Sequence, residues 1–269
     1  MNKSTEAYLP GAAARFIDEK LASGFVSFPL NELTAKTGLS EVAARNQLLR
    51  LGNRIVRVTP RQQFFLIVTP QHRVIGTPPI DWWLDDYMNW LSRPYYLALQ
   101  SAAAAHGSSQ QAIQETQIIT PKPQRDVLVG RIRVRFFMKA SARNSIVQTL
   151  SGAYAPVAIS TAETTAFDLI RYAHNLGGIE RMAETIAPML QSMKPRALRL
   201  VLDAENEIPT TQRLGYVLEA LGAQNMAKVS REWLPARLNL VPLSVHAASV
   251  KGAVVNEKWN VINNTACTI

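Results

Sequence analysis

The chain has 269 residues, of which 47% are hydrophobic and 18% charged, as in a folded globular protein. No continuous apolar stretch approaches the roughly 18 to 20 residues of a membrane span, and the start, MNKSTEAYLPGAAARF, lacks the apolar segment and cleavage site of a secretory signal, so we expect a soluble, cytoplasmic protein. The net charge of +9 favours an acidic partner, most commonly nucleic acid, although an acidic protein surface would be attracted by the same field.

The N-terminal segment predicts a helix followed by a short strand. Pro10 lies near the start of residues 9–23, whose apolar side chains recur at helical spacing, and Gly24 ends the pattern. The apolar residues 25–28 are short enough for a strand that pairs with a later hairpin. Together they would begin a winged helix-turn-helix unit.

Residues 31–68 carry the sequence logic of a helix-turn-helix. A first helix would begin at Asn31 and end at Gly38, and Ser40 is placed to cap a second helix over residues 41–51. Within that second helix, Ala44, Leu48 and Leu51 recur at spacings of four and three residues and give a narrow buried stripe.

The opposite face of the second helix carries the residues that would contact DNA. They are Val42, Ala43, Arg45, Asn46 and Arg50. Small and amide side chains at a helix start, with arginines around them, suit a helix that enters the major groove, where Asn binds adenine edges and Arg binds guanine or phosphate. We expect Val42, Ala43 and Asn46 to face the bases.

A hairpin, the wing, is predicted after Gly52. Two runs of β-branched and aromatic residues, 55–58 and 64–68, flank the sequence TPRQQ. Between residues 41 and 73 there are six arginines and one acid, Glu41. The arginines that we expect to contact phosphates are Arg45, Arg50, Arg54, Arg57 and Arg61. The alternative is a small helical subdomain with a solvated basic face, but helix spacing, cap, turn, hairpin and charge all agree with DNA binding.

Prolines at positions 70, 78 and 79 make a regular helix improbable over residues 69–79, so we place a domain junction there. The expected domains are a winged helix-turn-helix domain, 1–75, and a second domain, 80–269. Next come two helices, one through Trp83, Tyr87 and Trp90 and one over residues 95–105. The aromatic side chains predict a core where the two domains meet, with a partner surface or a base-stacking platform as alternatives.

Arginines and apolar residues alternate in the sequence VLVGRIRVRFFMK. A short strand at residues 117–120 precedes it, and the alternation of Arg131, Arg133 and Arg135 with apolar residues predicts a strand with one arginine face. Such a strand is either a solvated edge strand, which we favour, or a contact for an acidic partner.

The C-terminal part of the chain predicts mainly helices. Ser160 or Thr161 is placed to cap a helix that runs to residue 173, and further helices are predicted over 179–193, with an interruption at Pro188, 195–204 and 209–221. A final strand is predicted at residues 259–263. The fold class is therefore α+β, an N-terminal winged helix-turn-helix domain followed by a larger mixed α/β domain.

Signatures of metal, cofactor or catalytic chemistry are missing from the sequence. Cys267 is the single cysteine, which excludes an intrachain disulfide and a cysteine metal cluster. The four histidines are too widely spaced for a metal site: His72, His106, His174 and His246. The sequence has no phosphate-loop motif and no GxSxG motif. We therefore expect no metal, no cofactor and no enzymatic activity.

Three alternating carboxylates could supply metal ligands if they lay on a strand. Asp203, Glu205 and Glu207 alternate, and on a strand they would share one face as metal ligands, although such residues more often lie in a loop or at a strand end.

Several segments, in order, resemble the AbiEi family of antitoxins from type IV toxin–antitoxin systems. These segments are GLSEVAARNQLLRL with its wing, PYYLALQSAAAAHG, QIIT with RIRVRFF, STAETTAFDLIRYAHNLGG and the terminal EKWNVINN. The resemblance implies a winged-helix domain that binds operator repeats and represses its own operon. It also implies a larger domain that counteracts a partner toxin resembling nucleotidyltransferases, directly or functionally, and a possible dimer on DNA.

A second hypothesis is a winged-helix regulator without a toxin partner. Its second domain would bind a small ligand or another protein, and the aromatic helices over residues 81–105 would line the pocket. An adjacent nucleotidyltransferase-like gene would favour the antitoxin, and its absence would favour the regulator.

Overall fold

The computed structural model describes residues 11–108, 115–150, 155–245 and 253–265. Cys267, His246 and the segment before Gly11 lie outside the described residues. The described residues form two compact units. The first lies within Met1–Arg93, Arg125–Val134 and Ser151–Val157, and the second within Pro94–Gln124, Arg135–Leu150 and Ala158–Ile269.

The first unit begins with three helices and a three-stranded antiparallel sheet in the strand order β1-β3-β2. In chain order the elements are α1 (Ala12–Ala22), β1 (Ser27–Pro29), α2 (Leu30–Thr37), α3 (Glu41–Arg50), β2 (Ile55–Arg57) and β3 (Phe64–Ile67). The helices and the hairpin thus lie where the sequence predicted them. The strand β1 pairs with β3 of the hairpin, with Phe28 opposite Phe65.

Local sequence explains the turn between α2 and α3. Gly38 ends α2 in the left-handed conformation, at φ 69°, which glycine adopts without a steric penalty. Ser40 precedes α3 with extended backbone, and its Oγ accepts a hydrogen bond from the Ala43 amide at 3.3 Å. This is the cap that the sequence predicted.

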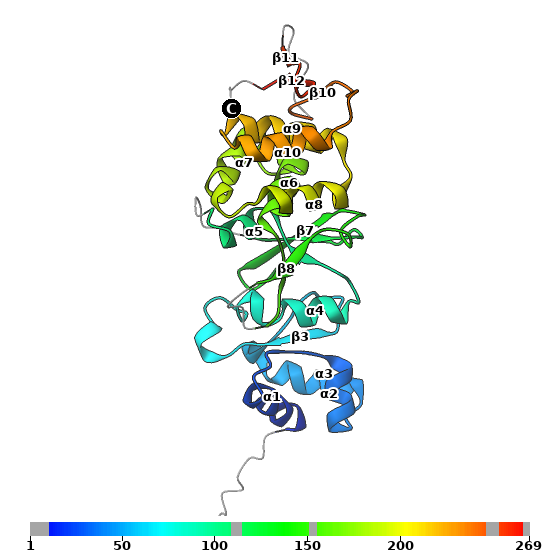
Figure 1. Cartoon of the computed structure of the whole chain (residues 1–269). Coiled ribbons are helices and arrows are strands. Elements are labelled where there is room, and N and C mark those ends of the chain that lie inside the picture. Colours follow the sequence, from blue (N-terminus) through cyan, green and yellow to red (C-terminus); the bar gives the residue numbers. More distant parts are fainter. Residues whose placement is uncertain (1–10, 109–114, 151–154, 246–252, 266–269) are drawn as a thin grey trace, which may run out of the picture. The chain divides into compact units, whose positions relative to one another are not determined.

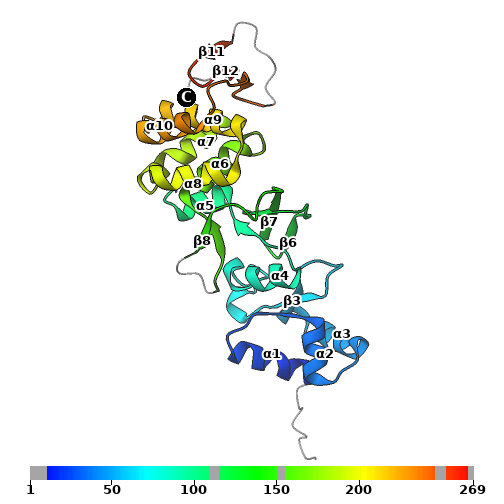
Figure 2. The same cartoon turned by 45° about the vertical axis from the view of Figure 1, so that its right-hand side comes forward.

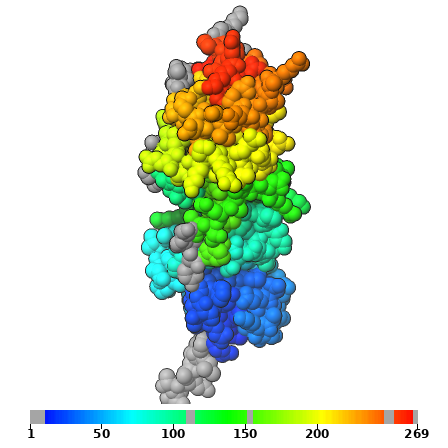
Figure 3. All heavy atoms as spheres, in the orientation of Figure 1, coloured from blue at the N-terminus to red at the C-terminus, as the bar shows by residue number. Residues whose placement is uncertain are grey.

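The three helices share a core with one face of the sheet. Phe16 and Ile17 of α1, Leu33 of α2 and Leu48 of α3 belong to one buried cluster. The strands add Phe28, Phe65 and Ile67 to this cluster. The blue atoms of these helices lie in contact in the space-filling view (Figure 3).

The other face of the same sheet is covered by α4 (Leu84–Trp90), as Figures 1 and 2 show. The Phe64 ring lies 5.4 Å from the ring centroids of both Tyr87 and Trp90. Ser27 donates a hydrogen bond of 2.6 Å to Asp86. All four residues of β3 are therefore buried.

These contacts place the aromatic helix in the first unit, which extends to Arg93 and so passes the expected boundary at residue 75. The first unit also contains the 3-10 turns η1 (Gly52–Arg54), η2 (Pro70–His72) and η3 (Ile80–Trp82). One strand of the large sheet, β6 (Val127–Val129), belongs to this unit as well. The division into functional domains at 1–75 and 80–269 stays a prediction.

The large sheet has six strands in the order β6-β7-β5-β4-β9-β8. The strands other than β6 are β4 (Tyr96–Leu97), β5 (Glu115–Thr120), β7 (Ile132–Met138), β8 (Val147–Thr149) and β9 (Ala158–Ser160). Two expectations were wrong here. The arginine strand β7 is not an edge strand, because β6 pairs with it antiparallel, Leu128 opposite Arg133. Tyr96 lies in a strand rather than in a helix, because it pairs with Ile119.

The described residues of the second unit include six α-helices. They are α5 (Leu99–Ala105), α6 (Ala162–Arg171), α7 (Ile179–Ile186), α8 (Pro195–Glu205), α9 (Ile208–Ala220) and α10 (Gln224–Trp233), with 3-10 turns η4 (Ala173–Asn175) and η5 (Ala187–Gln191). The predicted cap of α6 is Thr161, whose Oγ1 accepts from the Thr164 amide at 3.3 Å. The predicted break at Pro188 is the change from α7 to η5. The sequence did not predict α10.

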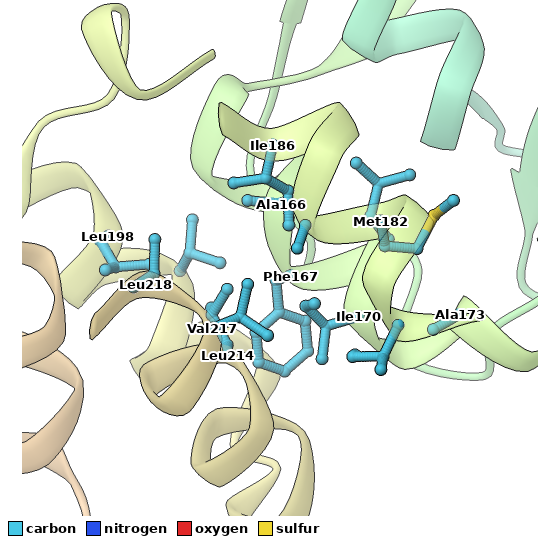
Figure 4. Close-up of a cluster of buried hydrophobic side chains, with 14 of the residues drawn as sticks. Ala166, Phe167, Ile170, Ala173, Met182, Ile186, Leu198, Leu214, Val217 and Leu218 are labelled. Carbon is cyan, nitrogen blue, oxygen red and sulfur yellow. The ribbon is translucent and has the colours of Figure 1, made fainter. Parts of the chain in front are cut away.

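The core of the second unit is built around α6, whose residues 162–170 are all buried. Figure 4 shows Phe167 of α6 beside Leu214 and Val217 of α9, while Met182 and Ile186 of α7 belong to the same cluster. Since neighbouring elements cover α6 on every side, its polar side chains are buried and need hydrogen-bond partners inside the protein.

A small sheet follows at the end of the chain, in the order β10-β12-β11. Its strands are β10 (Val241–Pro242), β11 (Val254–Asn256) and β12 (Val261–Asn263), the last within the predicted final strand. Trp259 is fully buried, and a Cβ added to Gly215 would lie 2.1 Å from its ring. Among the described residues, none of the helices has the length and apolar character needed to span a bilayer.

Candidate functional site

The helix α3 has one buried side and one exposed side. Ala44 and Leu48 point into the core, and the second of these is only 5% exposed. Val42, Asn46 and Arg50 are exposed, while Ala43 and Arg45 are half-buried. The structure thus brings Val42 and Asn46, which are one helical turn apart, onto the same solvent-facing side.

Three of the predicted phosphate-binding arginines have partners within the first unit. The Arg45 Nη2 lies 2.6 Å from the Glu41 carboxylate, one helical turn earlier. The Arg54 Nη2 lies 2.7 Å from the Asp18 carboxylate. Arg57 donates to the Pro60 carbonyl at 2.9 Å, at the tip of the hairpin. A phosphate would have to compete with these groups.

Arg50 and Arg61 are exposed, and neither makes a hydrogen bond or ion pair with another residue in the described part of the chain. Arg50 ends α3, and Arg61 lies in the loop between β2 and β3. Since a guanidinium carries a positive charge at any physiological pH, both are available to an anion such as a phosphate.

The arginines of β7 also differ from one another. Arg131 and Arg133 are exposed, whereas Arg135 is half-buried, with its Nη1 3.3 Å from the Glu115 carboxylate and its guanidinium 4.8 Å from the centre of the Phe137 ring. Arg131 and Arg133 are therefore accessible to a partner, whereas the guanidinium of Arg135 is already paired with Glu115.

The second unit contains a buried charged cluster that the sequence did not predict. The Nζ of Lys139, which is fully buried, lies 2.7 Å from both the Asp168 and the Glu205 carboxylates and 3.0 Å from the Tyr96 hydroxyl. Tyr96 donates to Asp168 at 2.8 Å, and Ser145 donates to Glu205 at 2.8 Å. We call these five residues the lysine cluster.

Burial determines the electrostatics of the lysine cluster. Burial raises the pKa of Asp168, and the attraction of Lys139 opposes that rise. Burial and the nearby Asp168 charge raise the pKa of Tyr96, which keeps the hydroxyl protonated as a donor. One oxygen of Glu205, Oε2, is buried without a hydrogen-bond partner. All five residues of the cluster are buried, so the cluster is closed to a ligand from solvent.

The structure also corrects the prediction that Asp203, Glu205 and Glu207 could share one face of a strand. Asp203 and Glu205 lie on α8, with Asp203 on the surface beside Arg199, and Glu207 follows the helix and pairs with Arg171. Within the described ranges, no group of three or more His, Cys, Asp or Glu residues is placed to hold a metal ion.

A surface pocket of about 510 Å³ lies in the second unit, between η5 and the start of α10. Met193, Leu221 and Met226 are among its lining residues. The aromatic residues over 81–90 are elsewhere: Trp83 and Tyr87 are buried in the first unit, and their rings lie 6.1 Å apart. They fill a core, as the sequence predicted, but this core lies within the first unit, against its own sheet, and not where two domains meet.

Comparison with known proteins agrees with the fold and identifies a domain. The crystal structure of the RV2827C protein from Mycobacterium tuberculosis matches with a TM-score of 0.66 at 15% sequence identity, covering 96% of this chain and 92% of that chain. At this identity the likeness shows the fold alone. A search of the curated proteins gives no match.

A family model matches the segment that holds the whole lysine cluster. The match covers residues 96–220 and is to the AbiEi antitoxin C-terminal domain. Tyr96, Lys139, Ser145, Asp168 and Glu205 all lie within it. The family resemblance predicted from the sequence is thereby confirmed: this chain carries the C-terminal domain of the AbiEi antitoxin family.

Proposed function

We propose that this chain is an antitoxin that also represses its own operon by binding operator DNA. The match of residues 96–220 to the AbiEi antitoxin C-terminal domain carries the proposal. The toxin that it counteracts would resemble nucleotidyltransferases, as the family implies, and would be encoded beside it.

The repressor activity is assigned to the first unit, as a winged helix-turn-helix. Its support is the side of α3 opposite the core, where Val42 and Asn46 face solvent. Arg50 and Arg61 carry positive charges that are not neutralised by another described residue. In helix-turn-helix proteins one side of the recognition helix faces the bases of the major groove, and basic side chains around it contact the flanking phosphates.

The antitoxin activity is assigned to the part of the chain that matches the family model, residues 96–220. Exposed Arg131 and Arg133, at the start of β7, are the proposed contact for an acidic partner. Arg135 is not included, because Glu115 already pairs with it.

Co-expression tests the antitoxin activity. The neighbouring toxin gene is induced with and without this chain, and the expected result is restored growth with the wild-type chain. Arg131→Ala with Arg133→Ala should reduce rescue if the toxin is contacted directly, while Arg196→Ala, an exposed arginine on α8, serves as the charge-matched control. Failure of the wild-type chain to restore growth would refute the antitoxin assignment.

DNA binding tests the repressor activity. The purified chain should shift DNA from upstream of its own operon, and added salt should weaken the complex. Arg50→Ala should weaken binding by roughly 1 to 3 kcal/mol if the arginine contacts a base, and by less if it contacts a phosphate. Arg54→Ala should have a smaller effect, because Asp18 already occupies that guanidinium. A chain that binds this DNA no better than unrelated DNA would contradict the assignment.

The regulator without a toxin loses one of its supports. It required the aromatic helices to line a ligand pocket, but Trp83 and Tyr87 are buried against the first unit's own residues. We therefore favour the antitoxin.

A further inference from the structure

We infer that the exposed side of α3 binds thymine methyl groups, so that the operator bound by this chain has A·T pairs under Val42 and Leu49. The inference rests on the proposed DNA binding and goes beyond it, because it names the base pairs that the helix selects and the two apolar residues that select them.

Val42, Asn46 and Leu49 form one stripe along α3. They are separated by four and then three residues, the spacing of side chains on one side of a helix. Val42 is 66% exposed and Leu49 is 76% exposed. Ala44 and Leu48 complete the core on the other side, so the stripe needs a partner outside the unit to be buried.

The chemistry of the stripe matches one kind of base pair. In the major groove an A·T pair presents the N6 and N7 of adenine and the methyl group of thymine. Asn46 has the paired donor and acceptor that fit the adenine edge, and apolar side chains fit the methyl group. With Asn46 between Val42 and Leu49, the stripe offers an apolar, an amide and another apolar contact in succession.

Arg45 is poorly placed to select a G·C pair instead. Guanine is most often bound by a bidentate arginine, but the Arg45 guanidinium is held by Glu41 at 2.6 Å. Arg50, the arginine of this helix without a partner among the described residues, follows Leu49 directly and therefore points about 100° away from it, off the stripe.

The local charge favours DNA over a protein as the partner that binds the exposed side of α3. Six arginines lie between residues 41 and 73 with Glu41 as the single acid. Arg50 and Arg61, which no other described residue neutralises, suit the phosphates that border a groove.

Removing single methyl groups from the DNA tests the inference. The full chain first selects a duplex from a random pool, and each thymine of that duplex is then replaced by uracil, which differs only in lacking the methyl group. At one or more positions the dissociation constant of the protein–DNA complex should rise about fourfold, because burial of one methyl group contributes about 0.8 kcal/mol. Val42→Ala should abolish the effect at one of these positions and Leu49→Ala at another.

Val74→Ala is the matched control, because this valine is also exposed but lies outside α3. It should leave every uracil effect unchanged. Selected duplexes with G·C pairs throughout, or uracil substitutions without effect, would overturn the inference while leaving DNA binding intact. Failure to select any duplex would overturn the proposed DNA binding itself. Loss of self-association in Leu49→Ala, measured by sedimentation, with no change in DNA affinity would show that the stripe binds a second copy.

Discussion

Replacement of Lys139 by methionine removes the cation from the lysine cluster while keeping most of the side chain's volume. The Nζ donates to Asp168 and Glu205, each at 2.7 Å, and both carboxylates are closed off from solvent. In Lys139→Met, Asp168 retains the Tyr96 hydroxyl and Glu205 retains the Ser145 hydroxyl, but each loses its charged donor.

The expected loss follows from these two contacts. A hydrogen bond to a charged group contributes about 1.5 to 3 kcal/mol, so two of them give roughly 3 to 6 kcal/mol. Removing one partner of a buried ion pair typically destabilises a protein by about 3 to 5 kcal/mol. We therefore expect Lys139→Met to lower the free energy of unfolding of the second unit by about 3 to 5 kcal/mol.

The loss should grow as pH rises. Burial raises the pKa of Asp168 in the folded protein, so the folded state holds this proton more tightly than the unfolded state. Stability from this group is therefore present below its unfolded pKa and is lost as pH rises through the folded pKa. Without Lys139, the attraction that opposes the rise is gone, so the pKa of Asp168 rises further and the variant is weakest at high pH.

Urea unfolding of the full chain, followed by circular dichroism at about pH 5 and about pH 8, measures both effects. Lys228→Met is the control, because that lysine is on the surface of α10, and it should change the free energy by about 0.5 kcal/mol or less. A loss below about 1 kcal/mol in Lys139→Met at both pH values would refute the account of the lysine cluster.

Three further predictions concern single residues. Ser40→Ala should lower the stability of the first unit by about 0.5 to 2 kcal/mol in thermal unfolding, because the cap of α3 is lost, and an unchanged melting temperature would contradict it. Gly215→Ala should lower the stability of the second unit by about 1 to 3 kcal/mol in urea, because the new Cβ meets the buried Trp259 ring; a neutral effect would show that the ring moves freely. In DNA binding, Arg61→Ala should reduce the slope of log affinity against log salt by about 1, and an unchanged slope would show that this arginine meets no phosphate.

Local sequence signals were sufficient for the three helices and the hairpin at the start of the first unit. Gly38, Ser40 and the spacing of Ala44 and Leu48 act within one or two helical turns, so the boundaries of α3 could be predicted from neighbouring residues. The same signals gave the exposed side of α3. They did not show that Glu41 and Asp18 hold two of the arginines, because the second of these contacts joins residues 36 positions apart.

The large sheet and the second unit depend on pairings that no local pattern contains. Tyr96 belongs to a strand because Ile119 lies opposite it, although the sequence around it favours a helix. The strand β7 is covered by β6, a run of three residues too short to stand out. The helix α10 was missed because Ala227 and Ser230 make up much of its buried stripe, which weakens the apolar pattern.

The lysine cluster was hidden for a related reason. Its residues come from the strand β4, the connection between β7 and β8, and the helices α6 and α8, and they meet only in the folded unit. One local signal was available: Asp168 lies within the apolar stripe of α6, between Phe167 and Leu169. A carboxylate in that position requires a buried partner, but the sequence does not say that the partner is Lys139.

Separation of the two activities is the most direct test of the proposed function. Repression of a reporter behind the chain's own upstream DNA and rescue from the neighbouring toxin are measured in one strain, for the wild-type chain and for Arg50→Ala with Arg61→Ala. The proposal predicts that the wild type does both and that the double variant loses repression but still rescues growth. A double variant that represses as well as the wild type, or a wild-type chain that fails to rescue growth, would contradict it.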